Sequence, residues 1–388
     1  TCIRMGAPLD SAGRNLFPNA ERRLKSPQNM HSLFPGESAL LRQTERIAER
    51  CHFTLDDLAY QFPSFPTACG QSQGSLLREL TLRGARERYG ALTPSIKAQL
   101  QKELQVICKL ELAGYFLIVW DIVRFARDHD IMVQGRGSAA NSAVCYALGI
   151  TAVDPIGMQL LFERFLSEER GEWPDIDLDL PSGPKRERVI QYVYRAYGPA
   201  GAAMTANVIT YRTKSALREV GKALGFSSEK LDRVSRSSGR WSSLEDPNGL
   251  QEVFSEAGLD PKDERVALWV QHAAALRGHP RHLGQHSGGM VIAAGRLDEV
   301  VPIEPASMPG RSVIQWDKED CSELGIIKVD LLGLGMLNAL ERAIPLVRAT
   351  EGIELDYAKL PPRDPQVYDL ISRADTIGVF QIESRAQM

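Results

Sequence analysis

Strict alternation of acidic and apolar residues at 174–180 constrains the fold of this 388-residue chain more than any other feature. The run Pro-Asp-Ile-Asp-Leu-Asp-Leu predicts a strand in which Asp175, Asp177 and Asp179 share one face and the apolar side chains bury the other. Carboxylates about 7 Å apart along one face repel one another unless cations lie between them. The run therefore indicates a site for Mg²⁺, which prefers oxygen ligands. An amphipathic edge strand whose acids only face water fits the same pattern.

A second acidic position follows at Asp330, the only acid within the apolar run 326–334. Lys328 lies two residues earlier, on the same face of a strand predicted at 324–330. If this strand lies beside the first one, Asp330 completes an acidic cluster and Lys328 becomes a phosphate ligand. Two metal ions in such a cluster support in-line phosphoryl or nucleotidyl transfer. A purely structural Lys–Asp pair is the alternative.

A Gly-Arg-Gly-Ser turn lies about 40 residues before the acidic strand, within the segment 134–142. We expect a short strand at 131–133 before it and an apolar helix at 143–148 after it. Glycines let backbone amides approach phosphate oxygens, a helix N-terminus adds partial positive charge, and Arg136 can chelate a phosphate. The spacing is not that of an ATPase loop, and glycine-rich helix entries also arise for steric reasons alone.

Positive charge is concentrated at 185–241, which we expect to be helical, although the whole chain has a formal net charge of −3. The acids in this segment are only Glu187, Glu219, Glu229 and Asp232. A basic segment directly after a candidate metal strand favours contact with a nucleic-acid backbone, whereas an isolated basic face is often only solvated. The basic residues are Lys185, Arg186, Arg188, Arg195, Arg212, Lys214, Arg218, Lys222, Lys230, Arg233, Arg236 and Arg240.

Other residue patterns exclude several classes of protein. The six cysteines form no Cys-x-x-Cys pair, which indicates reduced thiols in the cytoplasm rather than a disulfide scaffold. The apolar run at 115–120 is far shorter than the roughly 20 residues of a membrane span, so we expect no membrane segment. His279, His282 and His286 resemble zinc-ligand spacing only loosely, and hydrogen bonds or contacts with a DNA backbone suit them better.

The remaining pattern is mixed α+β with a helical insertion between strands. Thr93 and Pro94 begin a helix whose apolar positions recur every three or four residues, and 115–126 predicts a buried helix. Another strand is expected at 288–293. The chain starts without methionine, in an irregular segment 1–48, and stops just after a strand-like stretch, so we expect a piece of a longer protein.

Several sequence blocks follow one another in a fixed order over some 250 residues. They are Gly-Arg-Gly-Ser at 135–138, Leu-Phe-Glu-Arg-Phe-Leu at 161–166, Pro-Asp-Ile-Asp-Leu-Asp at 174–179, His-Ser-Gly-Gly-Met-Val-Ile at 286–292, Lys-Val-Asp-Leu-Leu-Gly-Leu at 328–334 and Val-Phe-Gln-Ile-Glu-Ser at 379–384. This ordered set resembles the signature of bacterial family C DNA polymerases, the DNA polymerase III alpha subunits. Segments 211–222 and 308–318 resemble the damage-inducible, error-prone alpha paralogue more closely than the replicative form.

The resemblance implies an α+β fold with a palm of the polymerase-beta-like nucleotidyltransferase type, interrupted by a helical thumb and flanked by partial PHP and fingers domains. The implied boundaries are 1–48 for the C-terminal tail of the PHP domain, 49–208 for the first part of the palm, 209–285 for the thumb, 286–337 for the second part of the palm and 338–388 for the start of the fingers.

The resemblance also implies roles for particular residues. Asp177, Asp179 and Asp330 match the catalytic ligands of two Mg²⁺ ions, whereas Asp175 matches a family acid outside the catalytic three. Nucleotide phosphates are expected at Arg136, Gly137, Ser138 and Lys328. Contacts of the thumb with DNA are expected at Arg212, Lys214, Arg218 and Lys222.

The expected activity is DNA-directed DNA polymerisation, in which a primer 3′-hydroxyl on primer-template DNA attacks a dNTP, in error-prone translesion synthesis during DNA repair. A sliding clamp and accessory mutagenesis proteins are the partners that the family implies. The replicative alpha subunit is the nearest alternative. A two-metal nuclease or phosphoesterase and a noncatalytic DNA-binding scaffold are alternatives from other classes.

Overall fold

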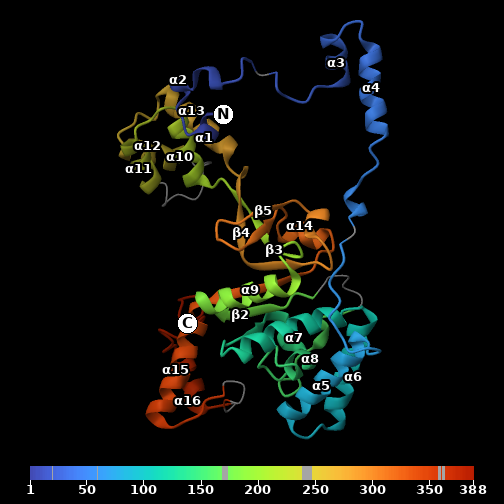
Figure 1. Cartoon of the computed structure of the whole chain (residues 1–388). Coiled ribbons are helices and arrows are strands. Elements are labelled where there is room, and N and C mark those ends of the chain that lie inside the picture. Colours follow the sequence, from blue (N-terminus) through green and yellow to red (C-terminus); the bar gives the residue numbers. More distant parts are fainter. Residues whose placement is uncertain (20, 59, 168–173, 238–246, 357–359, 361–362) are drawn as a thin grey trace. The chain divides into compact units, whose positions relative to one another are not determined.

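A computed structural model describes residues 1–19, 21–58, 60–167, 174–237, 247–356, 360 and 363–388. The chain divides into two compact units (Figure 1). The first unit combines Thr1–Asp57 with Val208–Gly284, and the second combines Leu58–Asn207 with Gln285–Met388. The expected mixture of helices and strands, with a helical segment inserted between strands, is confirmed.

The second unit is built on a mixed seven-stranded sheet with the order β1-β2-β7-β4-β3-β6-β5. β2 runs parallel to β7, and β3 runs parallel to β6. The pairs β1–β2, β4–β7 and β5–β6 are antiparallel. The strands are β1 (Gln134–Arg136), β2 (Asp177–Pro181), β3 (Ala202–Thr210), β4 (Pro280–Ile292), β5 (Ile303–Pro305), β6 (Ser312–Ile314) and β7 (Lys328–Leu334).

The acidic strand lies inside the sheet and not at its edge. β2 begins at Asp177 and pairs with β1 on one side and with β7 on the other. The edge-strand alternative is therefore wrong. The neighbouring strand was expected at 324–330, but β7 begins at Lys328 and continues to Leu334. The strand expected at 288–293 is confirmed within the longer β4.

The first glycine of the Gly-Arg-Gly-Ser block lies in a strand, although the whole block was expected to form a turn. Gly135 donates its N–H to the Ile150 carbonyl at 2.7 Å and pairs with Leu178 of β2. A Cβ at Gly135 would overlap the Ile150 backbone, so a glycine is needed for this close approach. The strand expected at 131–133 is wrong, because β1 starts only at Gln134. The turn begins at Gly137, whose φ of +73° suits glycine.

Helices α5 to α9 of the second unit share an apolar core with the sheet, and α5 to α8 are grouped together in Figure 1. The expected helix start at Thr93 is confirmed, because its hydroxyl accepts the Ile96 N–H at 3.3 Å. The buried helix expected at 115–126 is also confirmed. The helices are α5 (Gln73–Tyr89), α6 (Pro94–Lys109), α7 (Ala113–Asp128), α8 (Ala143–Ala147), α9 (Pro184–Tyr197), α14 (Lys318–Glu323), α15 (Gly335–Glu351) and α16 (Pro365–Ser372), with 3-10 turns η3 (Gly137–Asn141), η4 (Phe162–Arg164) and η6 (Leu297–Glu299).

The segment 185–241 was expected to be helical, but it is not helical throughout. Strand β3 interrupts it, and residues 202–206 of this strand are all buried. Alanine and methionine favour helices when isolated, but burial in the sheet decides the conformation here. The stretch 377–382, which looked strand-like, forms turns instead.

The first unit is helical and has its own core around Trp269. The indole N–H donates to the Leu217 carbonyl at 2.6 Å, and a Cβ on Gly221 would overlap the indole ring. Residues 1–48 were expected to be irregular, but they contain short helices, and Ile3 of α1 packs against this core. The helices are α1 (Cys2–Met5), α2 (Leu9–Ala12), α3 (Pro27–Leu33), α4 (Ser38–Glu49), α10 (Thr213–Ala223), α11 (Ser228–Ser237), α12 (Pro247–Glu256) and α13 (Glu264–Leu276), with 3-10 turns η1 (Gly13–Asn15) and η2 (Leu55–Asp57).

Within the described residues, no helix combines the length and the apolar character that a membrane crossing requires.

Candidate active site

A row of facing residues crosses four strands of the sheet and brings the predicted acids together. Asp177 of β2 lies in register with Arg136 of β1 and with Asp330 of β7, and Asp330 lies opposite Gly289 of β4. Residues in register on neighbouring strands point to the same face. The condition set by the sequence, that the strand of Asp330 lies beside the strand of Asp177, is therefore met.

Three carboxylates form a cluster on this face. One oxygen of each of Asp175, Asp177 and Asp330 lies within 4.8 Å of the other two. Asp330 Oδ1 is buried and has no hydrogen-bond partner among the described residues. Because a buried carboxylate oxygen without a partner is costly, and because the donors are all oxygens, the residues fit a hard divalent cation.

Asp179 lies further along the same face of β2 but belongs to a different contact. Arg136 donates through Nε to both Asp179 oxygens, at 2.9 and 3.2 Å, and its terminal nitrogen lies 3.3 Å from Asp177 Oδ2. Of the three predicted metal ligands, the structure thus groups Asp177 with Asp330, and Asp175 completes the group in place of Asp179. The role of Asp179 as a metal ligand stays a prediction.

The crowding of carboxylates affects their protonation. Burial, together with the negative charges of Asp175 and Asp330, raises the pKa of Asp177 to about 6, although Arg136 acts in the opposite direction. Burial also raises the pKa of Asp179, against the lowering effect of Arg136. The face holds more negative charge than its own cations balance, so binding of a further cation is favoured.

Lys328 links the acids on the other side of the cluster. Its ammonium donates to both oxygens of Asp175 and to Asp330 Oδ2, each at 2.9 Å. Burial disfavours the ammonium charge, but attraction to Asp330 and Asp175 outweighs this effect and raises the pKa of Lys328. The lysine therefore stays protonated. The Lys–Asp pair that the sequence suggested as a structural alternative is present, and a phosphate-binding role stays a prediction.

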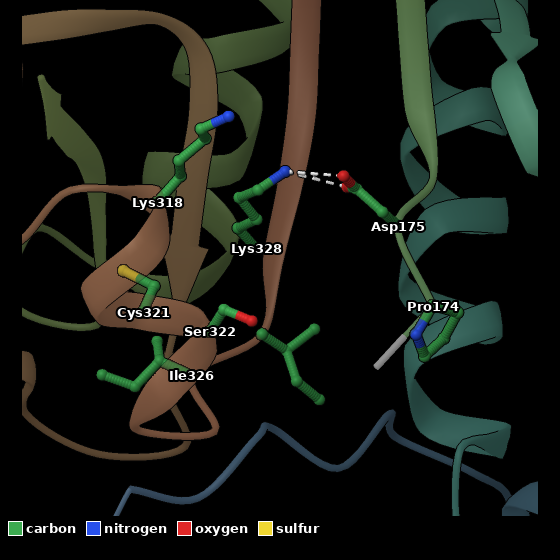
Figure 2. A pocket seen from close by; sticks show the side chains of 8 residues that line it. Pro174, Asp175, Lys318, Cys321, Ser322, Ile326 and Lys328 are labelled. Atoms are coloured by element: carbon green, nitrogen blue, oxygen red, sulfur yellow. Dashed lines mark hydrogen bonds and ion pairs between the residues drawn. The ribbon is translucent and has the colours of Figure 1, made fainter. Parts of the chain in front are cut away.

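Two adjoining hollows open beside these residues. A hollow of about 310 Å³ is lined by Pro174, Asp175, Lys318, Cys321, Ser322, Ile326, Ile327 and Lys328, most of which are labelled in Figure 2. A second hollow of about 500 Å³ shares some of these residues and reaches Arg136, Asp177, His286 and Asp330. Lys318 and Ser322 were not predicted from the sequence as site residues, although Lys318 ends one of the segments that resemble the error-prone paralogue.

His286 and Gly289 shape the wall next to Asp330. His286 Nδ1 accepts the N–H groups of Gly288 and Gly289 at 3.2 and 2.6 Å, so its ring proton is on Nε2. A Cβ on Gly289 would overlap Thr205 Oγ1 and come within 3.1 Å of Asp330 Oδ1. The glycine therefore leaves the space that the carboxylate of Asp330 needs. Three histidines lie close together in the sequence, His279, His282 and His286. Among the described residues, none of them belongs to a group of side chains that could bind a metal ion together.

The helix that follows the Gly-Arg-Gly-Ser block does not offer a free N-terminus. The N–H groups of Ala143 and Val144 at the start of α8 both donate to the buried carboxylate of Glu103, at 3.0 Å. The expectation that this helix end attracts a phosphate is therefore wrong, because a protein carboxylate already occupies it. Gly137 and Ser138 lie in η3, before α8, and their role as phosphate ligands stays a prediction.

The basic residues of 185–241 are divided between the two units. Arg186 of α9 belongs to the second unit, where its Nε donates to the Leu331 carbonyl at 2.7 Å and so supports β7. In the first unit, Arg218 pairs with Asp232 at 2.6 Å and Lys222 pairs with Glu219 at 3.1 Å. Arg212 and Lys214 are exposed near the start of α10, and Arg240 lies outside the described residues. Much of the local positive charge is therefore balanced within the protein.

Comparisons with known proteins identify the family of this chain. The bacterial DNA polymerase III alpha NTPase domain matches residues 75–333, and the finger domain of the same subunit matches residues 336–388. Over its whole length the chain is 49% identical to the error-prone DNA polymerases of Dechloromonas aromatica, Bordetella parapertussis and Pseudomonas aeruginosa, and it spans 37%, 36% and 37% of their lengths. The resemblance inferred from the ordered blocks is confirmed. The chain belongs to the family of bacterial DNA polymerase III alpha subunits.

Proposed function

We propose that the protein is a DNA-directed DNA polymerase of the error-prone type, which adds a dNTP to the 3′-hydroxyl of a primer paired with a template. One observation carries this proposal. Asp177 and Asp330 lie in register on parallel strands, and one buried oxygen of Asp330 has no hydrogen-bond partner among the described residues. A cation between these acids would satisfy that oxygen, and relatives that match the whole chain are named error-prone DNA polymerases.

In the proposed site, Asp177, Asp179 and Asp330 hold two Mg²⁺ ions. When bound, such ions lower the pKa of an attacking hydroxyl and offset the charge of a departing pyrophosphate. The acids are already arranged for this task, because the sheet holds Asp177 and Asp330 on paired strands. Rigid backbone placement avoids the cost of ordering ligands on loops.

Arg136 and Lys328 are the proposed ligands of the triphosphate, together with Gly137 and Ser138. In the structure both cations are paired with carboxylates that would bind metal, at 2.9 Å in each case. Guanidinium and ammonium groups bind phosphate oxygens strongly, so an incoming triphosphate can compete for them. Cations that arrive with the nucleotide would take over the neutralisation of the acids.

The first unit supplies the proposed contacts with the DNA duplex. Arg212, Lys214, Arg218 and Lys222 lie on or next to α10, which we assign to the thumb. Contacts with phosphates fix the position of a duplex without reading its sequence. The division into PHP tail, palm, thumb and fingers, a cytoplasmic location, translesion synthesis, and binding to a sliding clamp and accessory mutagenesis proteins all belong to this proposal.

Primer extension by the full-length polymerase tests the proposal. Asp177→Asn should abolish extension with Mg²⁺, while the far-ultraviolet circular dichroism stays that of the wild type. Asp298→Asn is a matched control, because Asp298 is an exposed acid that pairs with Arg296 away from the cluster. Extension by Asp177→Asn at the wild-type rate would show that the site is wrongly assigned. Release of nucleotides from DNA without any dNTP would instead indicate a two-metal nuclease, and poor bypass of lesions would indicate the replicative alpha subunit.

A further inference from the structure

Asp175 is the member of the acidic cluster that no proposed metal role uses. Its side chain is 55% exposed, yet both of its oxygens accept from the Lys328 ammonium at 2.9 Å. An exposed carboxylate usually stays solvated, because a surface ion pair gains little. The partner here is unusual, since the Lys328 side chain is only 16% exposed. Asp175 therefore meets a lysine that is largely withdrawn from water.

The ammonium contacts three carboxylate oxygens, namely both oxygens of Asp175 and Asp330 Oδ2. Asp330 Oδ1 is not among them, and it has no hydrogen-bond partner among the described residues. If Asp175 were absent, Lys328 would keep only its contact with Asp330, and its flexible side chain could turn towards the oxygens that face the cation.

Lys328 and Asp175 also form part of the wall of the 310 Å³ hollow, together with Lys318 and Ser322 (Figure 2). The dashed lines in Figure 2 join the end of Lys328 to the Asp175 carboxylate at the side of this hollow. The contact fixes the ammonium where an anion entering the hollow would meet it. An ammonium ordered in advance binds a phosphate with less loss of conformational entropy.

We propose that Asp175 is a positioning residue, which acts through Lys328 and holds its ammonium ready for the nucleotide phosphates and away from the metal-binding oxygens. This inference rests on the proposed polymerase function. It assigns to Asp175 a role different from that of a metal ligand, although one of its oxygens lies close to Asp177 and Asp330.

The first test is Asp175→Asn in the full-length polymerase, with steady-state primer extension as the assay. We expect the KM for dNTP to rise about tenfold, because one charge-assisted contact of Lys328 is lost. kcat and the Mg²⁺ concentration for half-maximal rate should stay within about twofold of the wild type. The lost contact weakens the binding of the dNTP equally in the ground state and in the transition state, and the metal ligands are retained. Asp175→Glu should restore much of the KM, and the control Asp298→Asn should change neither constant.

The second test repeats the substitution in a Lys328→Met background. Lys328→Met should itself raise the KM for dNTP. If Asp175 acts through Lys328, adding Asp175→Asn to this variant should cause no further rise, and the two effects should be strongly non-additive. A further loss of kcat, with a higher requirement for Mg²⁺ in both backgrounds, would make Asp175 a metal ligand and would overturn the inference.

Different results would overturn the role of Asp175 and the proposed polymerase function. A wild-type KM in Asp175→Asn, alongside an inactive Asp177→Asn, would overturn the role of Asp175 and leave the polymerase function standing. Wild-type activity in Asp177→Asn would remove the proposed function itself. Thermal melting of each variant distinguishes these outcomes from misfolding. A folding defect lowers the melting temperature together with kcat, and it does not change the KM for dNTP alone.

Discussion

Glu103 and Asp330 are both buried carboxylates of the second unit, and their surroundings offer them very different numbers of donors. Glu103 is fully buried and accepts hydrogen bonds from Gln99 at 2.9 Å, Ser142 at 2.7 Å, and the Ala143 and Val144 N–H groups at 3.0 Å. Burial raises the pKa of Glu103, while these donors counteract the shift. Its hydrogen-bonding capacity is met within the protein, which is the pattern of a structural group.

Asp330 is buried almost as deeply, with 7% exposure, but among the described residues only one of its oxygens has a hydrogen-bond donor. Its neighbours across the strands include Asp177, a like charge. The fold thus supplies neutral donors to both oxygens of Glu103, whereas among the described residues it supplies a donor to only one oxygen of Asp330. The contrast distinguishes a carboxylate whose hydrogen bonds are all made within the protein from one that we propose to bind a cation.

The largest effect is expected from Asp330→Asn. Loss of this carboxylate should reduce primer extension by at least about 10³-fold, because removal of one charge from a two-metal site weakens stabilisation of the transition state. The melting temperature should stay the same or rise, because repulsion with Asp177 is relieved. Primer-extension rates and thermal melts of the full-length polymerase measure both. A clear drop in stability without loss of activity would make Asp330 a structural residue like Glu103.

The next effect is expected from Glu103→Ala. The N–H groups of Ala143 and Val144 and the hydroxyl of Ser142 would lose their acceptor, which should lower the free energy of unfolding by about 3 kcal/mol. Urea denaturation measures the change, and Glu87→Ala, at an exposed position of α5, is the control. The folded fraction at low temperature should extend primers at close to the normal rate. Selective loss of kcat with normal stability would contradict the structural role.

A smaller effect is expected from Arg136→Lys, which tests the cation beside the acids. Lysine keeps the charge but cannot contact both Asp179 oxygens through one planar group. The KM for dNTP should rise about tenfold, because a bidentate contact is lost. Steady-state kinetics at saturating Mg²⁺ measure the constant. An unchanged KM would show that Arg136 only balances charge, as the donors around Glu103 do.

The smallest effect is expected from pH and Mg²⁺ on stability. The pKa of Asp177 in the folded protein, about 6, lies above its ordinary value of 3.8. A raised carboxyl pKa means that the metal-free protein loses stability as the pH rises from about 4 to 6. Mg²⁺ at tenfold its Kd should raise the melting temperature by about 3 °C at pH 8, with little change at pH 5. The increase should disappear in Asp330→Asn and persist in Glu87→Ala.

The sequence predicted the elements of the site better than its contacts. Alternation identified the face that carries Asp177 and Asp179, and the lone acid of an apolar run identified Asp330, because period-two patterns are local. Resemblance to the family supplied the link between the two strands. The pairing of Lys328 with Asp175 could not be predicted, because it depends on how two distant segments lie side by side.

The contacts of Glu103 could not be predicted from the sequence either. It lies on α6 among ordinary helix formers, and nothing local distinguishes it from an exposed glutamate. Only packing of α6 beside α8 reveals that it caps a helix some 40 residues later. Strand β3 was missed for a related reason, since its alanines gain their strand conformation from burial between neighbouring strands.

The parallel pairing of β2 with β7 has a consequence for the order in which the protein is made. Residues 182–327 are translated after the first acids and before the strand that completes their cluster. At ordinary rates of synthesis, Asp330 is therefore added roughly 8–30 s after Asp177. A nascent chain released in that interval would carry Asp177 without Asp330, so the acidic cluster is complete only after translation has passed residue 330.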